Sequence, residues 1–437
     1  MMTYEEAVNY LNSFIDYERK DDYSYSEEVF DLKRVELLLK KLGNPHKNLK
    51  VIHIAGSKGK GSVACFCASI LKEAGFKTGL YTSPHLETFR ERIRINDEFI
   101  SKEDVVELAG IMKPHTEKIG ALSFFEVYTA MAFLYFQKEK VDMAVMEVGL
   151  GGRLDATNVV NPLVCVITPI SFEHTQKLGN TLAGIAKEKS GIIKKKSVVV
   201  SSVQKKEALN VIKKAAKAKG ASVYVVGEDI LYQEIKSTDK GQTFSVTGFF
   251  GEYAPLEINL LGEHQLINAA SAIGAMEALG FNRIIISKEA IKTGLSQARW
   301  PGRIEVVGNK PTIVLDGAQN AASAQALAKT IKKCFSYRKL ILILGVSKDK
   351  DMAGMAKILK PIADKIIITR ANLPRAAEPD FLASFFDKDE NIEITQSVEE
   401  AVGRARECAK DDDLILICGS LFVVGEAGLA VRSQAGS

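Results

Sequence analysis

Short, β-branched apolar segments alternate with helix-length segments along most of this chain. Apolar strands that alternate with helices form right-handed βαβ units, whose parallel sheet is covered by helices on both faces. The predicted strands of the first part are 51–56, 78–83, 142–149, 164–170, 197–202 and 222–227, with helical segments such as 62–75 and 127–140 between them. Segments 242–248 and 255–261 alternate more like antiparallel strands and predict a small side sheet.

The same alternation starts again after residue 300. The further predicted strands are 312–318, 340–346, 365–371 and 414–420, with helical segments between them. The joint is placed at 298–303, where Pro301 and Gly302 break any helix. We therefore predict an α/β protein with a larger N-terminal domain at 1–298 and a smaller, doubly wound C-terminal domain at 299–437.

Composition argues against several classes of protein. The 437 residues carry 58 Lys and Arg against 54 Asp and Glu, and a net charge of +4 is too small to indicate a nucleic-acid partner. The 6 cysteines form no C-x-x-C pair and lie mostly in apolar segments, which predicts reduced thiols and a cytoplasmic location. No apolar run reaches the roughly 18 residues of a membrane span. The acidic, amphipathic N-terminal segment does not resemble a secretion signal.

A loop rich in glycine and lysine, GSKGKGS, spans residues 56–62 between a predicted strand and a predicted helix. Closely spaced glycines let backbone N–H groups converge on phosphate oxygens, and the helix N-terminus adds partial positive charge. Lys60 can reach the outer phosphates, and Ser62 can offer a hydroxyl to Mg²⁺. The loop lacks the first glycine of G-x-x-x-x-G-K-[ST], and Gly61 separates Lys60 from Ser62, which indicates a nucleotide-binding ligase rather than a kinase or GTPase. The alternative is a glycine-rich turn with incidental lysines.

Three ionisable residues stand close to predicted strand ends or helix ends. Glu147 ends a buried strand, where a Mg²⁺ ligand beside a phosphate loop is expected, although a surface glutamate is the alternative. The glycine-rich stretch 149–158 follows it and permits close approach of a ligand. His174 follows another strand, and Lys189 lies in the basic cluster 186–196. By themselves, a lone histidine is more typical of a structural role and such a lysine of a solvent-facing helix end.

Taken together, these stretches resemble one family: folylpolyglutamate synthase and the bifunctional dihydrofolate synthase of the Mur ligase superfamily. The matching stretches are 53–62, 81–95, 147–158, 178–192, 262–275, 301–305, 316–320, 347–351 and 419–427. The resemblance covers roughly residues 30–427 in order. It implies an N-terminal P-loop ATPase domain with a mainly parallel sheet, a smaller Rossmann-like C-terminal glutamate ligase domain, and an active site between them.

The resemblance also implies roles for individual residues. Lys60, Lys189 and His174 would be catalytic. ATP would be bound by Gly56, Ser57, Lys58, Gly59, Lys60, Gly61, Ser62, Asn268, Arg303 and Asp316. Ser83, Glu147 and His174 would hold Mg²⁺, and Ser83, Pro84, His85, Phe125 and Asp155 would line the pterin or folate site. Lys189 looks like the lysine that the family carries as a carbamate, an anion formed from a neutral amine and CO₂, and its side chain is expected to face solvent.

Three positions depart from the family pattern. Glu173 stands before the metal histidine, where the family usually has Asp. Gln319 replaces the histidine of the family's DGAHN motif, which puts that contact in question, although the amide can keep one hydrogen bond. Lys58 replaces the commoner Asn and adds positive charge near the phosphates.

The implied reaction is the ATP-dependent addition of L-glutamate to a folate, and to dihydropteroate, through an acyl phosphate. It implies two Mg²⁺ ions, a monomer, and no nucleic-acid or membrane partner. Two alternatives are a UDP-muramoyl peptide ligase of the same superfamily and a non-catalytic nucleotide-binding regulator. The 83–86 and 149–158 stretches argue against the first, and the retention of Lys60, Glu147, His174 and Lys189 argues against the second. The sequence leaves open the preferred folate form, the number of glutamates added and any need for a monovalent cation.

Overall fold

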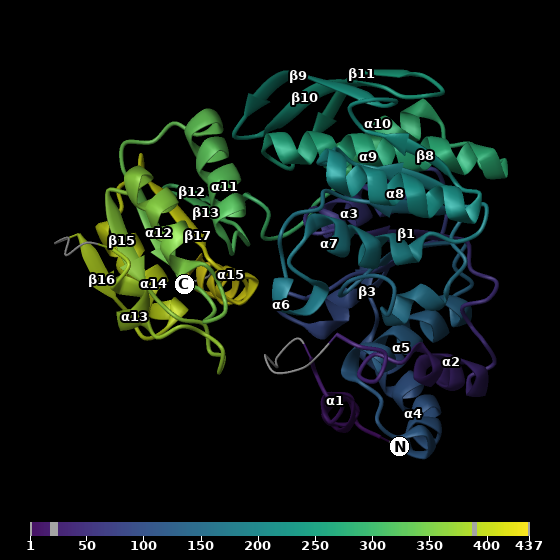
Figure 1. The fold of residues 1–437 in the computed structure, drawn as a ribbon. Helices are drawn as coiled ribbons and strands as arrows, with labels where there is room; N and C mark the ends of the chain where they lie inside the picture. Colours follow the sequence, from purple (N-terminus) through teal and green to yellow (C-terminus); the bar gives the residue numbers. More distant parts are fainter. Residues whose placement is uncertain (1, 18–24, 387–390, 436–437) are drawn as a thin grey trace.

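The chain forms two sheet-based units that follow one another in sequence (Figure 1). The computed structural model describes residues 2–17, 25–386 and 391–435. An eight-stranded sheet and a three-stranded sheet precede the predicted joint, and a six-stranded sheet follows it. The predicted α/β class with two units is confirmed, whereas the division at residue 298 remains a prediction.

The eight-stranded sheet has the order β4-β3-β2-β5-β1-β6-β7-β8. Its strands are β1 (Val51–Ala55), β2 (Thr78–Tyr81), β3 (Ile93–Ile95), β4 (Glu98–Phe99), β5 (Met143–Glu147), β6 (Val164–Ile167), β7 (Val198–Ser201) and β8 (Ser222–Val225). In this order, all strands from β2 through β5, β1, β6 and β7 to β8 are parallel. Beyond β2, the strands β3 and β4 add an antiparallel edge. Ile54 is opposite Glu147, and Ala55 is opposite Ile167, so the central strands end at a common edge. The loops that follow those strands therefore meet at that edge.

Helices cover both faces of this sheet. One face packs against α3 (Lys60–Glu73), α9 (Glu263–Leu279) and α10 (Lys288–Gln297). The other face packs against α1 (Tyr4–Asn12), α2 (Leu32–Lys41), α4 (Lys102–Ile119), α5 (Phe124–Lys138), α7 (Leu182–Lys189) and α8 (Lys206–Lys219). The central strands β1, β5 and β6 are buried along their whole length, because both of their faces are covered.

A three-stranded antiparallel sheet packs over α9 on the first of these faces. It consists of β9 (Leu231–Thr238), β10 (Gly241–Thr247) and β11 (Glu252–Ile258). The predicted side sheet at 242–248 and 255–261 is thus confirmed as β10 and β11. The strand β9 was not predicted, because its sequence LYQEIKST is mostly polar and lies at the edge of the side sheet.

The six-stranded sheet has the order β12-β13-β17-β14-β15-β16. Its strands are β12 (Glu305–Asn309), β13 (Thr312–Leu315), β14 (Leu340–Leu344), β15 (Lys365–Ile368), β16 (Ile392–Ile394) and β17 (Leu414–Cys418). Alternate residues of β14 pack against α11 (Ala321–Cys334) and α12 (Met352–Leu359) on one face, and against α14 (Val398–Cys408) and α15 (Leu421–Ala435) on the other. The short α13 (Pro379–Ala383) precedes β16. The antiparallel edge strand β12 and the edge strand β16 were not among the predicted strands.

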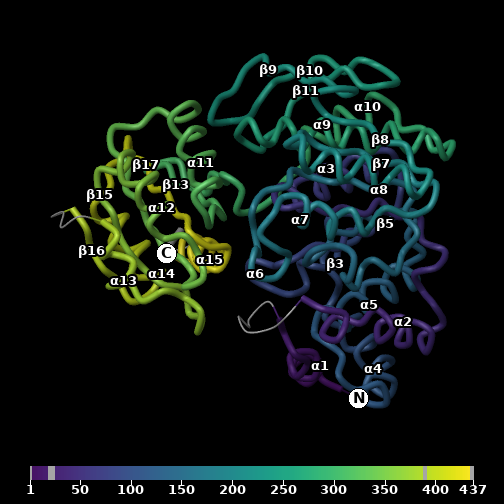
Figure 2. The backbone as a smooth tube through the Cα atoms, in the orientation of Figure 1, coloured from purple at the N-terminus to yellow at the C-terminus, as the bar shows by residue number. Residues whose placement is uncertain are grey.

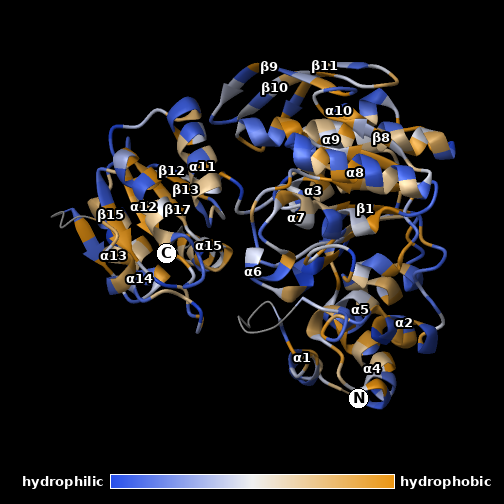
Figure 3. Cartoon of the chain, in the orientation of Figure 1, coloured by the Kyte–Doolittle hydropathy of each residue, from blue (hydrophilic) through white to orange (hydrophobic). Residues whose placement is uncertain are grey.

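The chain crosses between the two units after α10, and Figure 2 shows this connection as a single stretch of tube. Figure 3 colours the cartoon by hydropathy, and hydrophobic residues are concentrated in the sheets and along one side of many of the helices. In the part of the chain that the structure describes, no helix combines the length and the apolar character that crossing a membrane requires.

The contact between α3 and α10 gives a prediction about stability. A Cβ added at Gly294 would lie 2.7 Å from the backbone nitrogen of Ile70, whereas a Cβ added at Gly110 in α4 meets nothing within 4 Å. Gly294→Ala should lower the free energy of unfolding by about 1–3 kcal/mol, because the two helices must separate. Gly110→Ala should raise the free energy of unfolding by about 0.4–1 kcal/mol, because alanine lowers the conformational entropy of the unfolded chain. Urea unfolding of both variants checks this, and equal midpoints would contradict it.

Candidate active site

A cavity of about 650 Å³ lies where the two units face each other. Its walls come from the loop after β1, the loops after β2, β5 and β6, the start of α9, and the loops after β13 and β14. Of the predicted site residues, the cavity is lined by Ser57, Lys58, Gly59, Lys60, Gly61, Ser62, Ser83, Pro84, Phe125, Glu147, Asp155, His174, Asn268, Arg303 and Asp316. The structure thus brings together residues that are up to 259 positions apart, from Ser57 to Asp316.

Two glycines of the loop, Gly56 at its start and Gly59 just before α3, could not easily be replaced by another residue. Gly56 has φ 151°, and a Cβ there would lie 2.8 Å from the Cβ of Thr168. Gly59 has φ 87° and stands before the first residue of α3, and a Cβ there would lie 3.0 Å from the side-chain Cγ of Asn268. The backbone therefore makes a tight turn against β6 and α9 and presents the N-terminus of α3 to the cavity, as a phosphate site requires.

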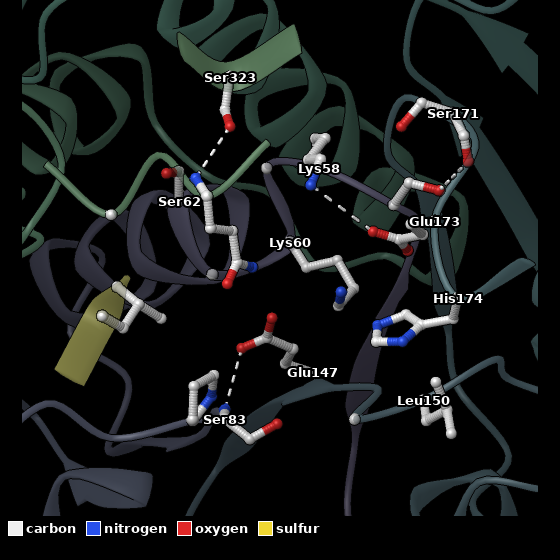
Figure 4. Close-up of a pocket in the computed structure, with 18 of the residues that line it drawn as sticks. Lys58, Lys60, Ser62, Ser83, Glu147, Leu150, Ser171, Glu173, His174 and Ser323 are labelled. Atoms are coloured by element: carbon white, nitrogen blue, oxygen red, sulfur yellow. Dashed lines mark hydrogen bonds and ion pairs between the residues drawn. The ribbon is translucent and has the colours of Figure 1, made fainter. Parts of the chain in front are cut away.

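Two side chains stabilise this loop from within. The Lys60 ammonium donates to the Gly56 carbonyl at 3.2 Å, so it lies folded over the loop. Ser57 Oγ donates to the Ser171 carbonyl at 3.0 Å, which ties the loop to the segment after β6. Figure 4 shows the Lys60 side chain between Glu147 and His174. Lys58 lies above it in this view, and a dashed line joins Lys58 to Glu173. The loop thus gathers positive charge at the helix start, where phosphate groups bind.

Glu147 supplies a buried carboxyl opposite that charge. It is the last residue of β5, it is 4% exposed, and its Oε2 accepts the N–H of Ser83 at 3.1 Å. Burial raises the pKa of Glu147 to about 7, against the opposing effect of Lys60 and Arg303. The carboxyl can therefore exchange a proton near neutral pH, and it gains from any cation that comes to lie beside it.

Lys189 is buried, so the expectation of a solvent-facing side chain is wrong. It is 2% exposed, and its Nζ donates to the Gly56 carbonyl at 2.8 Å and to Glu173 Oε1 at 2.9 Å. The basic cluster around it suggested a solvated helix end, but the last turn of α7 faces the phosphate loop rather than water. Burial lowers the pKa of Lys189, against the opposing effect of Glu173.

Glu173, a departure from the family pattern, is the charged partner of two lysines. It accepts from Lys189 and also lies 3.8 Å from the Nζ of Lys58. Burial alone would raise the pKa of Glu173, but Lys189, Lys60 and Lys58 hold it well below its usual range. His174 follows it with φ 46° at the start of the short α6 (Thr175–Leu178), and this left-handed turn brings the imidazole to the cavity wall.

The glycine-rich stretch after β5 is organised by Asp155. Its Oδ2 accepts the backbone N–H groups of Gly149 and Leu150 at 3.0 and 2.9 Å, and its Oδ1 accepts the N–H of Thr157 at 3.0 Å. Phe125 packs against this turn, since a Cβ at Gly149 would lie 2.6 Å from its ring. Asp155 is 4% exposed, so it holds the loop in shape as well as lining the cavity.

The predicted pterin-site segment 83–85 is divided between the cavity and its surroundings. Ser83 and Pro84 line the cavity, but His85 is not among its lining residues. The Nδ1 of His85 accepts from the Arg92 guanidinium at 2.8 Å. Gly56 and Lys189 likewise lie behind the cavity wall rather than in it.

Residues of the second unit close the opposite wall. Asp316 is 8% exposed and accepts the N–H groups of Ile304 and Ala318 at 3.0 and 2.9 Å. Burial raises the pKa of Asp316 to about 6, against the opposing effect of Arg303. The backbone N–H of Gln319 donates to Ser323 Oγ at 3.1 Å, while Gln319 itself lines the cavity.

Sequence reasoning missed several lining residues. Asp349, Lys350 and Arg375 line the cavity from the loops after β14 and β15. A signal was present, because 347–351 matched the family and follows a buried parallel strand, where ligand-binding residues are expected. Asp16, Tyr17 and Phe30 also line it, and no motif marks them.

Comparison with known proteins identifies the family. Residues 54–276 match the family model described as the Mur ligase middle domain, and residues 302–421 match the Mur ligase, glutamate ligase domain. A Dihydrofolate synthase/folylpolyglutamate synthase of Bacillus subtilis is 37% identical over 404 residues, covering 90% of this chain and 93% of that protein. The chain belongs to the folylpolyglutamate and dihydrofolate synthase family of Mur ligases. The predicted family, and with it the ligase class, are confirmed.

Solved structures of this family agree over the whole chain. Mycobacterium tuberculosis folylpolyglutamate synthase complexed with ADP superimposes with a TM-score of 0.89 at 32% identity, covering 99% of this chain and 98% of that one. Escherichia coli FolC in complex with DHPP and ADP superimposes with a TM-score of 0.86 at 29% identity, again covering 99% and 98%. The two-unit arrangement is thus the fold of this ligase family.

The position of Lys60 gives a prediction. Lys60→Ala should lower ATP-dependent turnover by about 10²–10³-fold, because we expect this ammonium to be the preorganised cation that faces the ATP phosphates. The melting temperature should stay within about 2 °C, since among the described residues the ammonium hydrogen-bonds to the Gly56 carbonyl alone. Lys214→Ala, an exposed lysine on α8, is the matched control and should match the wild type in both. Near wild-type turnover by the Lys60 variant would contradict the assignment.

Proposed function

We propose that this chain joins L-glutamate to a folate at the expense of ATP, and that it also joins L-glutamate to dihydropteroate. The names of its relatives support both activities, since the Bacillus subtilis relative carries both in its name. The Escherichia coli relative holds DHPP and ADP together, and the Mycobacterium tuberculosis relative holds ADP. The partners are therefore ATP, L-glutamate and a folate or dihydropteroate.

One observation carries this proposal: a single cavity is lined by a phosphate loop, by the loops after β2 and β5, and by polar loops of the second unit. Its volume of about 650 Å³ is in the range of sites for small molecules and cofactors. Three substrates that react in one place need such a shared site. Two units that meet around it can also exclude water from a reactive intermediate.

The chemistry starts from a carboxylate, which is a poor electrophile. Transfer of the ATP γ-phosphoryl group to the substrate carboxylate gives an acyl phosphate, and the α-amine of L-glutamate then attacks it while phosphate leaves. Lys60 and Arg303 offset the negative charge that gathers between the carboxylate and the triphosphate. Asn268, packed against Gly59, and Asp316 line the cavity from α9 and from the second unit, where they would contact the nucleotide.

The residues present fit Mg²⁺. Glu147 offers a buried carboxyl whose pKa is raised, and the hydroxyl of Ser83 and the imidazole of His174 line the same cavity. Such carboxyl and hydroxyl oxygens are the donors that Mg²⁺ prefers. Within the described residues, no three or more His, Cys, Asp or Glu side chains cluster closely enough to hold a metal ion. Ser83, Glu147 and His174 would therefore share Mg²⁺ ions with the phosphates, which would polarise the transferring phosphoryl group.

The two alternative functions are less well supported. A UDP-muramoyl peptide ligase would share the Mur ligase domains, but the relatives that match most of the chain are named folylpolyglutamate or dihydrofolate synthases. A non-catalytic regulator would have no need to keep Lys60, Glu147, His174 and Lys189 around one site. Six free cysteines, four of them buried, suit the reducing cytoplasm, where we place the protein as a monomer.

The proposed activity is tested by giving the purified protein ATP, Mg²⁺ and L-glutamate with either dihydropteroate or tetrahydrofolate. We expect mass spectrometry to show each pterin extended by glutamate, with ADP and phosphate formed only when the pterin is present. If only tetrahydrofolate is extended, the proposed dihydrofolate synthase activity is contradicted and the folylpolyglutamate synthase activity stands. ATP hydrolysis without any extended product would overturn the proposal. The Lys60→Ala variant, assayed in the same way, is the negative control.

We also propose that Lys189 works as a carbamate. Its lowered pKa favours the neutral amine, which adds CO₂ through its nitrogen lone pair and releases one proton to solvent. The product carries carboxylate-like oxygens in place of an ammonium. The ion pair with Glu173 is the competing state of the same side chain.

The Lys189 variants separate these two states. Lys189→Ala should lose most activity, and millimolar acetate should restore part of the rate, because the site then lacks an anion. Lys189→Arg should stay inactive, since a guanidinium keeps the positive charge and forms no carbamate. Because Lys189 is buried, circular dichroism must first show that both variants are folded. Rescue by methylamine instead of acetate would establish the ion pair and reject the carbamate.

A further inference from the structure

The segment 83–88, which joins β2 to the 3-10 helix at Phe89–Arg92, has two sides with different neighbours. On its front, Ser83 and Pro84 line the cavity, and the N–H of Ser83 donates to Glu147. On its back, Leu86 and Glu87 reach α15 of the second unit. We call this segment the β2 loop.

Glu91 makes the β2 loop a rigid unit. Its Oε2 accepts the N–H of Leu86 at 2.9 Å, and its Oε1 accepts the N–H groups of Glu87 and Thr88 at 2.8 and 2.7 Å. Three consecutive backbone donors thus converge on one carboxylate. The back of the loop is therefore held as one turn, and only Pro84 and His85 separate it from Ser83 at the front.

The back of the β2 loop docks on α15 through an unusually close backbone approach. A Cβ added at Gly425 would overlap the carbonyl oxygen of Leu86 and lie 3.1 Å from its carbonyl carbon. The Leu86 side chain packs against the apolar cluster of α14 and α15. Glu87 forms an ion pair with Arg432, which lies two turns beyond Gly425 on the same face of α15. Figure 1 shows α15 on the side of its unit that faces the N-terminal unit.

We propose that Gly425 is a positioning residue for the folate side of the cavity: by admitting the Leu86 carbonyl, it lets the second unit set where Ser83 and Pro84 stand. This inference rests on the proposed function, because it takes the β2 loop as the wall against which the pterin lies. Binding of the pterin is then coupled to the position of the second unit, which also carries Arg303 and Asp316.

Gly425→Ala isolates this contact. Alanine is the better helix former, so α15 itself is not weakened. The added methyl meets backbone rather than the end of a flexible side chain, so either the β2 loop or α15 must move. The matched control is Gly403→Ala on the neighbouring α14, where an added Cβ meets nothing within 4 Å.

The experiment measures KM for dihydropteroate and tetrahydrofolate, kcat, Kd for ADP and the melting temperature of both variants. For Gly425→Ala we expect KM for the pterin to rise by about 10-fold or more, because a shift of order 1 Å misplaces the wall. Kd for ADP should stay within about 2-fold, and the melting temperature should fall no further than in Gly294→Ala, while Gly403→Ala should keep wild-type kinetics. Hydrogen exchange at the amides of Leu86, Glu87 and Thr88 should quicken only in Gly425→Ala.

Two results would overturn the proposal. The first is a Gly425→Ala variant with unchanged pterin KM and unchanged exchange at the β2 loop. The second is an equal loss of pterin and ADP binding, which would mark a merely structural glycine. If the wild type makes no glutamylated pterin, the proposed function fails instead, and the hydrogen-exchange comparison still decides whether Gly425 positions the loop.

Discussion

Before any CO₂ is added to it, the buried ammonium of Lys189 joins three segments of the site. It donates to the carbonyl of Gly56 in the phosphate loop and to Glu173 in the loop after β6, while its own backbone ends α7. A buried charge is tolerated only where it is paired and hydrogen-bonded, and removing one partner of such a pair costs about 3–5 kcal/mol. The turn of the phosphate loop and the course of the loop that carries Glu173 are therefore determined together. The position of His174 is then determined by the loop that carries Glu173, because His174 is the next residue along it.

The common edge of the parallel sheet explains why most of the site could be predicted. Three parts of the site lie at the ends of the neighbouring strands β1, β5 and β6. The phosphate loop follows β1, Glu147 ends β5, and the segment 168–174 follows β6, and the registers bring these strand ends level. A sequence that shows buried strands also shows which residues come after them, and those residues must meet. The same argument holds in the second unit, where Asp316 follows β13, and it would have found Asp349 and Lys350 after β14 if applied there.

What could not be predicted depends on contacts between distant segments. Lys189 sits in AKEKSGIIKKK, whose composition is that of a solvated helix end, and its burial comes from a loop 133 positions earlier in the chain. The strands β3, β4, β9, β12 and β16 were not predicted, because each is short or mostly polar and none needs a continuous apolar run at or beside a sheet edge. His85 was assigned by its motif alone, and only the fold shows that it contacts Arg92.

Burial and charge act against each other at the two carboxyls that face the cavity. Burial raises the pKa of Glu147 to about 7 and that of Asp316 to about 6, in spite of Lys60 and Arg303 nearby. Between the ordinary carboxyl pKa and these values the folded chain holds more protons than the unfolded chain, so stability falls as pH rises through that window. A cation that binds beside Glu147 reverses the penalty and displaces the proton. The fold thus places two carboxyls where burial favours the proton and where a bound cation can replace it.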